Sequence, residues 1–98
     1  MNAPSIDIHA STDGHALRGE LTIRNVSHCR DVLLPLPAGT HHRLDLSGVS
    51  IIDGAGLQLL MLMLREASRQ GTQLEFVAPS RAVETALAMA RMQAPVAA

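Results

Sequence analysis

The chain has 98 residues, of which 47% are hydrophobic and 17% charged, with eight basic and nine acidic side chains. This length predicts one domain, and the hydrophobic content excludes intrinsic disorder. The formal net charge of −1 and a single aromatic residue, Phe76, argue against a nucleic-acid partner, which requires a basic surplus to neutralise phosphates.

Cysteine content and hydropathy suggest the compartment. Cys29 is the only cysteine and cannot form an internal disulfide. The first ten residues lack the basic segment that opens a secretory signal. The longest apolar run, residues 59–64, has six residues, whereas a membrane span needs about 20. We therefore expect a cytoplasmic protein that does not insert into a membrane.

The N-terminal segment is predicted to form a β-hairpin. Residues 5–10 alternate between polar and apolar side chains, with Ile6 and Ile8 on one face, which is the period-two pattern of a strand. Asp13-Gly14 is a strong signal for a tight turn. Residues 16–21 alternate again and give the second strand.

Residues 22–34 change to a helical period. Their apolar side chains recur at three- and four-residue steps, and Thr22 is placed to cap the first turn. Pro35 and Pro37 end this helix because proline cannot donate a backbone hydrogen bond. The side expected to face the core carries Ile23, Val26, Cys29, Arg30 and Leu33.

A strand, a loop and a long helix follow. Residues 43–46 are predicted to be a strand that Ser47-Gly48 closes, and residues 49–52 a connecting loop with buried aliphatic side chains. Asp53 precedes Gly54-Ala55-Gly56 and is expected to cap a helix that runs to about residue 70. Gly71 is the residue type that ends a helix in a left-handed conformation.

The last elements are a strand and a helix. Residues 72–77 are predicted to be a strand with Leu74 and Phe76 on one face. Pro79-Ser80 leads into a helix whose apolar stripe is expected to carry Val83, Leu87 and Ala90. Residues 92–98 are expected to be a frayed tail.

The order ββαβαβα predicts the fold class. Strands that alternate with helices form a sheet with parallel crossovers and helices packed against it. We therefore predict one α/β domain over residues 1–98, with an ordered core at residues 5–91 and a single mixed four-stranded sheet.

The long helix is more apolar than one buried side requires. Seven of the eight residues at 57–64 are apolar, whereas a helix that covers a sheet needs three or four in two turns. Leu59 and Met63 lie roughly 60–100° away from the predicted core-facing stripe. Either the core wraps widely around the helix, or these two side chains are exposed and contact a partner. The predicted stripe comprises Leu57, Leu60, Met61 and Leu64.

Residues 44–64 resemble the signature of STAS domains, the family named for sulphate transporters and anti-sigma-factor antagonists. The family motif has Asp, then Ser or Thr, a small residue, Gly and an aliphatic residue. Asp45-Leu46-Ser47 and Asp53-Gly54-Ala55-Gly56-Leu57 are similar to this signature. The resemblance covers nearly the whole chain, because the family's element order matches the predicted one, and it implies the STAS fold.

This resemblance implies a regulatory protein without enzymatic activity. Free-standing STAS domains typically bind a signalling protein, often a GHKL-type kinase that acts as an anti-sigma factor. Phosphorylation of the motif's Ser or Thr ends that binding. A phosphoryl group adds nearly two negative charges beside the capping Asp, and repulsion and desolvation then weaken the contact.

This sequence differs from the family at the phosphorylated position, where Gly54 has no hydroxyl group. The resemblance therefore implies binding that phosphorylation at this position does not control. Ser47 and Ser50 precede Gly54 and are expected to hydrogen-bond local backbone. The predicted partner-binding surface comprises Ser47, Ser50, Asp53, Gly54, Ala55, Leu59 and Met63.

Two kinds of partner remain open. Residues 56–60 resemble STAS proteins of bacterial chemotaxis-type signalling clusters, which implies a signalling partner. They also resemble the small STAS subunit of a phospholipid-trafficking ABC transporter, which docks on the transporter's ATPase. In that subunit the motif position usually carries Thr.

Other chemistries have little support. Gly54-Ala55-Gly56 lacks the third glycine of a dinucleotide-binding loop and the Lys-Ser/Thr pair of a P-loop, so nucleotide binding is the weaker hypothesis. His41 and His42 are adjacent and cannot chelate one metal ion from an extended segment. Asp45 and Asp53 lack an accompanying base. We therefore expect no catalytic residue, no metal and no cofactor.

Overall fold

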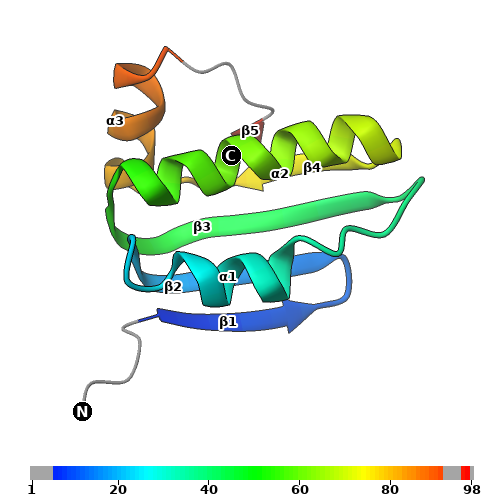
Figure 1. Cartoon of the computed structure of the whole chain (residues 1–98), viewed down its shortest axis with the longest axis horizontal. Coiled ribbons are helices and arrows are strands. Elements are labelled where there is room, and N and C mark those ends of the chain that lie inside the picture. The colour runs from blue at the N-terminus through cyan, green and yellow to red at the C-terminus, as the bar shows by residue number, and fades with distance from the viewer. Residues whose placement is uncertain (1–5, 92–95, 98) are drawn as a thin grey trace.

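The structure, a computed structural model, describes residues 6–91 and 96–97. Figure 1 shows one sheet, with α1 and α2 side by side across one of its faces. The elements in chain order are β1 (Ile6–Ser11), β2 (Gly14–Leu21), α1 (Val26–Leu33), β3 (His41–Ile52), α2 (Gly54–Gln70), β4 (Gln73–Val77), α3 (Arg81–Met89) and β5 (Val96–Ala97).

The sheet is mixed and its strands follow the order β1-β2-β3-β4-β5. β1 and β2 form the predicted antiparallel hairpin, with Ile6 opposite Gly19. β2 to β5 are parallel, so their carboxyl ends meet at one end of the sheet. The predicted order and the mixed sheet are confirmed. β5 adds a fifth strand inside the segment expected to be a frayed tail, and the rest of that segment, residues 92–95 and 98, lies outside the described residues.

β3 is longer than predicted because it continues through two irregularities. Ala16 pairs with Asp45 whereas Arg18 pairs with Gly48, so β3 carries one extra residue there. A second shift follows, between Gly19 and Glu20 of β2. Extra residues of this kind interrupt the alternation of buried and exposed side chains. The predicted loop at residues 49–52 is therefore wrong, and this segment belongs to the strand.

The turn before α1 also differs from the prediction. α1 begins at Val26 rather than at residue 22, and the Thr22 carbonyl accepts hydrogen bonds from the N–H groups of Asn25 and Val26, both at 2.9 Å. The buried Asn25 side chain donates to the carbonyl of Glu20 at 2.6 Å and holds this turn against the end of β2. Ile23 consequently points outward and is 68% exposed, so its predicted place in the core is wrong.

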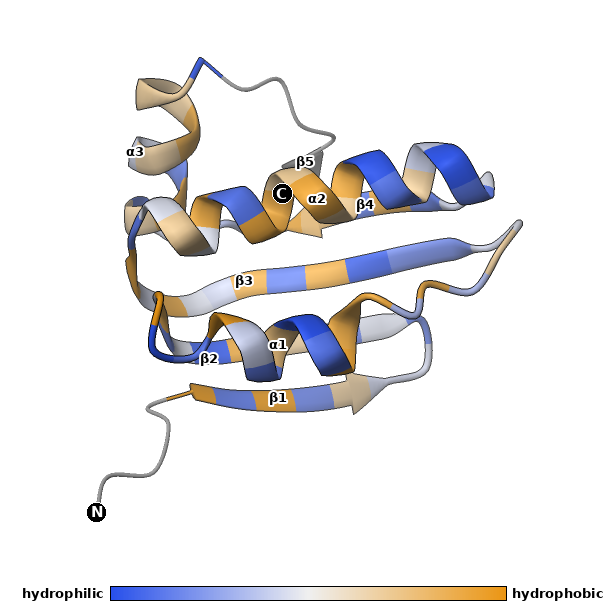
Figure 2. Cartoon of the chain, in the orientation of Figure 1, coloured by the Kyte–Doolittle hydropathy of each residue, from blue (hydrophilic) through white to orange (hydrophobic). Residues whose placement is uncertain are grey.

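The core lies between the sheet and the helices. Alternate side chains of β4 and of the first half of β1 point into it, and Figure 2 shows this alternation as orange and blue bands along β1. Phe76 is fully buried on β4. Burial of a Leu or Phe side chain stabilises the fold by about 1.5–3 kcal/mol. The largest fully buried aliphatic side chains include Leu17, Leu21, Leu33, Leu44, Leu46 and Leu60.

α3 closes the end of the sheet where β3 and β4 finish (Figure 1). Ser80 caps it, since its Oγ accepts a hydrogen bond from the N–H of Val83 at 3.2 Å. The Ser80 N–H donates to the carbonyl of Leu46 at 3.2 Å and ties this corner to β3. Val83 and Leu87 are buried as predicted, whereas Ala90 is exposed, contrary to the prediction.

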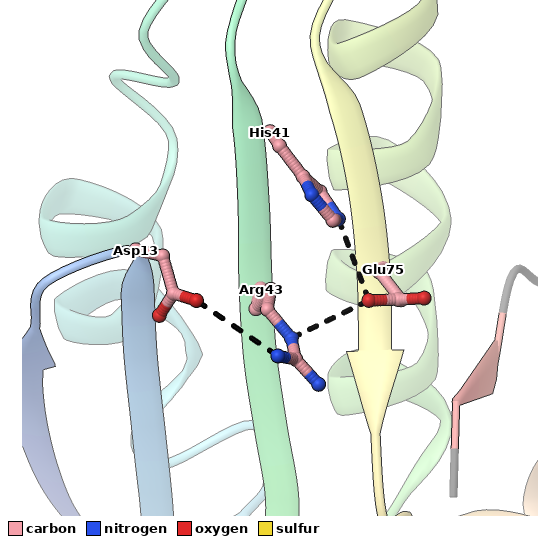
Figure 3. Close-up of polar contacts among 4 residues, drawn as sticks. All are labelled: Asp13, His41, Arg43 and Glu75. Carbon is pink, nitrogen blue, oxygen red and sulfur yellow. Dashed lines mark ion pairs between the residues drawn. The ribbon is translucent and has the colours of Figure 1, made fainter.

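The sheet face opposite α1 and α2 carries a row of ion pairs. Figure 3 shows these side chains in front of the strands, with both helices behind. Arg43 Nε lies 3.4 Å from Glu75 Oε1, and Arg43 Nη1 lies 3.9 Å from Asp13 Oδ2. His41 Nε2 lies 3.4 Å from the same Glu75 oxygen. All four side chains are partly exposed, so these pairs add little stability.

Candidate functional site

Asp53 begins α2 and joins it to the turn after β2. Its Oδ1 accepts a hydrogen bond from the N–H of Gly56, and its Oδ2 accepts one from the N–H of Ile23, each at 3.0 Å. These backbone donors, Ile23 foremost, lower the pKa of the Asp53 carboxyl below its usual value. The predicted N-cap is confirmed, and its second donor comes from a turn 30 residues earlier in the chain.

The two glycines at the start of α2 have different surroundings. A Cβ atom on Gly56 would collide with the carbonyl oxygen of Leu21, and would lie 3.0 Å from Cγ1 of Ile52. A Cβ atom on Gly54 would meet no heavy atom within 4 Å. Gly56 therefore allows α2 to approach β2 closely, whereas the exposed position of Gly54 has room for a side chain.

α2 turns a different side to the core than predicted. Met61 is 40% exposed, whereas Leu59 is 3% and Met63 0% exposed. Of the two alternatives for Leu59 and Met63, burial in a core that wraps around the helix is confirmed, and their place in the predicted partner-binding surface is wrong. The contact of Gly56 with β2 sets the rotation of the helix, and the helical period then carries neighbouring positions inward. The residues of α2 that are buried are Gly56, Leu59, Leu60, Met63 and Ala67.

A groove of about 540 Å³ lies between α1 and α2, hereafter the α1/α2 groove. Ile23 and Met61 line it, and the predicted site residue Ala55 lies in its wall. Ile51, two residues before Asp53, is 51% exposed, and its pairing with Glu20 turns its side chain to the sheet face opposite the groove. Ile23 and Met61 both belong to the predicted core-facing stripes of their helices, so their exposure contradicts the prediction. Since residues 57–64 are apolar on nearly every side, their hydropathy gave no signal for the exposed position.

The two serines of the predicted surface lie on β3 rather than in a loop. Ser50 Oγ donates a hydrogen bond at 3.2 Å to the carbonyl of Gly19 on β2, 31 residues earlier in the chain, so its predicted bond to local backbone is wrong. The Ser47 N–H donates to Oδ1 of Asp45 at 2.8 Å. Ser47 lines a separate hollow, shared with His9, so the structure does not bring it to the start of α2.

A histidine pair lies at the opposite end of the sheet, close to the turn between β1 and β2. His15 Nδ1 and His42 Nε2 are 3.3 Å apart. Burial lowers the pKa of His42 below its ordinary value, and His15 lowers it further, whereas Asp13 opposes both effects. The pair depends on the register between β2 and β3 and has no counterpart in the local sequence pattern.

Two further features concern residues 6–91 and 96–97. No group of three or more His, Cys, Asp or Glu side chains is placed to share a metal ion. None of the helices has the length and apolar character that a bilayer crossing requires.

Comparisons with known proteins identify the family. A comparison with curated proteins gives no match. Among solved structures, a candidate anti-sigma factor antagonist from Thermotoga maritima has 24% sequence identity and a TM-score of 0.70, over 95% of this chain and 86% of that chain, and thus the same fold. The family model for the Mlab, STAS domain matches residues 5–96. The chain therefore belongs to the STAS domain family, which confirms the resemblance carried by residues 44–64.

Proposed function

We propose that this STAS domain is a regulatory module without enzymatic activity that binds another protein through the surface at the start of α2. The observation that carries the proposal is the exposure of Ile23 and Met61, which both line the α1/α2 groove. They are two of the five large hydrophobic side chains exposed among the described residues. Apolar side chains gathered in one exposed region mark protein interaction sites.

The proposed contact does not depend on phosphorylation at position 54. Gly54 is exposed at the first position of α2 and has no hydroxyl to modify. Of the two predicted site serines on β3, Ser50 is the nearer to Gly54 in the chain. Its hydroxyl group already donates a hydrogen bond to the carbonyl of Gly19. We therefore propose that the folded chain binds its partner without modification.

The proposed partner is a signalling protein, either a GHKL-type kinase that acts as an anti-sigma factor or a protein of a chemotaxis-type cluster. The likeness of the fold to a candidate anti-sigma factor antagonist supports the first class. Both classes place the domain in the cytoplasm.

The second candidate is an accessory subunit that docks on the ATPase of a phospholipid-trafficking ABC transporter. A permanent subunit contact needs no phosphorylated residue, which fits Gly54. The resemblance at residues 56–60 does not separate the two candidates, because Gly56, Leu59 and Leu60 are buried and describe how α2 packs.

Affinity capture from the lysate of the source organism tests the proposal. The bait is the whole chain, and Met61→Glu is the variant expected to lose the partner. Met89→Glu is the matched control, because Met89 is 81% exposed on α3, outside the groove. Capture of a kinase or chemotaxis-type protein that only Met61→Glu loses supports the signalling role, and an ABC ATPase supports the second candidate. A partner that Met61→Glu and Ile23→Glu both retain would place the interface elsewhere.

A further inference from the structure

The α1/α2 groove has the length of a short helix. β2 and β3 are parallel, so α1 and α2 leave the same end of the sheet and run in the same direction (Figure 1). Along α2 the groove extends from Ala55 to Arg65, which corresponds to about 15 Å at 1.5 Å per residue. Val26, Leu59 and Leu62 contribute its apolar lining. An occupant of about three helical turns matches this length.

Two cations flank the far part of the groove. Arg30 of α1 and Arg65 of α2 both line it, and none of its lining residues is acidic. Neither arginine forms an ion pair within the described chain. The chain as a whole has a net charge of −1, so these cations are a local feature and not a reflection of overall charge. Charge complementarity therefore favours carboxylates on the occupant.

The walls of the groove determine the backbone form of the occupant. They are the sides of two helices, whose backbone donors and acceptors are engaged in their own turns. An occupant strand would find no backbone partners there, whereas a helix satisfies its own hydrogen bonds. A helix also presents apolar side chains at three- and four-residue steps to such a groove.

We infer that the α1/α2 groove receives an amphipathic helix of the partner protein, with an apolar stripe toward Val26 and Leu62 and carboxylates toward Arg30 and Arg65. This inference rests on the proposed function and adds the chemistry of the partner. The apolar stripe supplies contact area, and the two arginines select acidic over basic helices.

Two synthetic helical peptides test the inference against the full chain. Both have fourteen residues and one leucine stripe, and they differ only in carrying glutamate or lysine beside that stripe. Two exposed ion pairs correspond to roughly a two- to thirtyfold difference in Kd. We expect the glutamate peptide to bind about two- to thirtyfold tighter than the lysine peptide at low salt, with less difference at high salt. In nuclear magnetic resonance spectra, its addition is expected to shift the signals of Met61 and Leu62.

Charge reversal provides the control. The double variant Arg30→Glu/Arg65→Glu is expected to prefer the lysine peptide, while Arg81→Glu, on α3, keeps the original preference. Equal or absent binding of both peptides would overturn the inference, as would groove signals that respond only to phosphatidylglycerol vesicles or to self-association of the chain. If peptide selectivity fails while Met61→Glu still loses a lysate partner, the inference is wrong and the proposed function stands. If the peptides behave as expected while Met61→Glu and Ile23→Glu both retain every lysate partner, the proposed function fails.

Discussion

The two glycines at the start of α2 predict opposite effects of the same substitution. Gly54→Ala adds a methyl group in open space and removes the conformational freedom of glycine, so we expect about 0.5 kcal/mol of stabilisation. Gly56→Ala places a methyl group onto the carbonyl oxygen of Leu21 and close to Ile52, which forces α2 away from β2. Overpacking of this kind costs roughly 1–3 kcal/mol. The obstacle is backbone, which cannot rotate away, so we expect a loss near 2–3 kcal/mol.

Urea denaturation followed by far-ultraviolet circular dichroism measures both effects, since the chain has no Trp or Tyr for fluorescence. At an m-value of about 1–1.5 kcal/mol/M, the Gly56→Ala midpoint is expected to fall by about 2 M. The Gly54→Ala midpoint is expected to rise by less than about 0.5 M. Equal midpoints for the two variants would refute the close approach of α2 to β2. The same open space predicts that Gly54→Ser folds normally and offers a hydroxyl to a cognate kinase.

Three further predictions concern burial and pH. Met63→Glu buries a charge and is expected to unfold the chain at neutral pH, with a loss of folding stability above about 3 kcal/mol. Met61→Glu should change folding stability by less than about 0.5 kcal/mol. Thermal melts of the two variants that coincide would contradict the burial of Met63 and the exposure of Met61. The pKa of Asp53 is lowered by folding, so its contribution is present above the unfolded value, near 4, and is lost as pH falls through the native value. Asp53→Asn should lower folding stability by about 1 kcal/mol near neutral pH and by much less near pH 3. If urea melts give the same difference from the parent chain at both pH values, the hydrogen bonds of Asp53 with the N–H groups of Ile23 and Gly56 are not supported. The lowered pKa of His42 means that the unfolded chain binds a proton more readily, so stability should fall as pH drops below about 6.5. His42→Gln should flatten that slope, and parallel slopes would exclude the lowering of the His42 pKa by burial and by His15.

The predictions that succeeded depend on local signals. Asp53, Gly71 and Ser80 mark helix boundaries through their own backbone and side-chain chemistry, and the structure places caps at all three. The element order followed from alternating periodicity, and the motif at residues 44–64 carried the resemblance to the family that the family model confirms. These signals lie within a few residues of the feature that they specify, which is why they can be read without the fold.

The predictions that failed depend on contacts between distant segments. The side of α2 that faces the core is set where Gly56 meets Leu21, and a helix that is apolar nearly all round cannot reveal it. The outward position of Ile23 depends on the Asn25 side chain reaching back to β2. β3 extends to Ile52 because β2 accommodates its extra residues. The exposed apolar surface thus became visible only with the fold, as did the His15–His42 pair.

The hydrogen bond between Asp53 and the N–H of Ile23 has a consequence for the thermodynamics of association. It fixes the turn that carries Ile23 while the domain folds, so the conformational entropy of this turn is lost before any partner arrives. Association then does not bear that entropic cost, and a preorganised contact residue gains affinity in proportion. In the proposed function, Asp53 therefore contributes to partner affinity by keeping the side chain of Ile23 where it lines the α1/α2 groove.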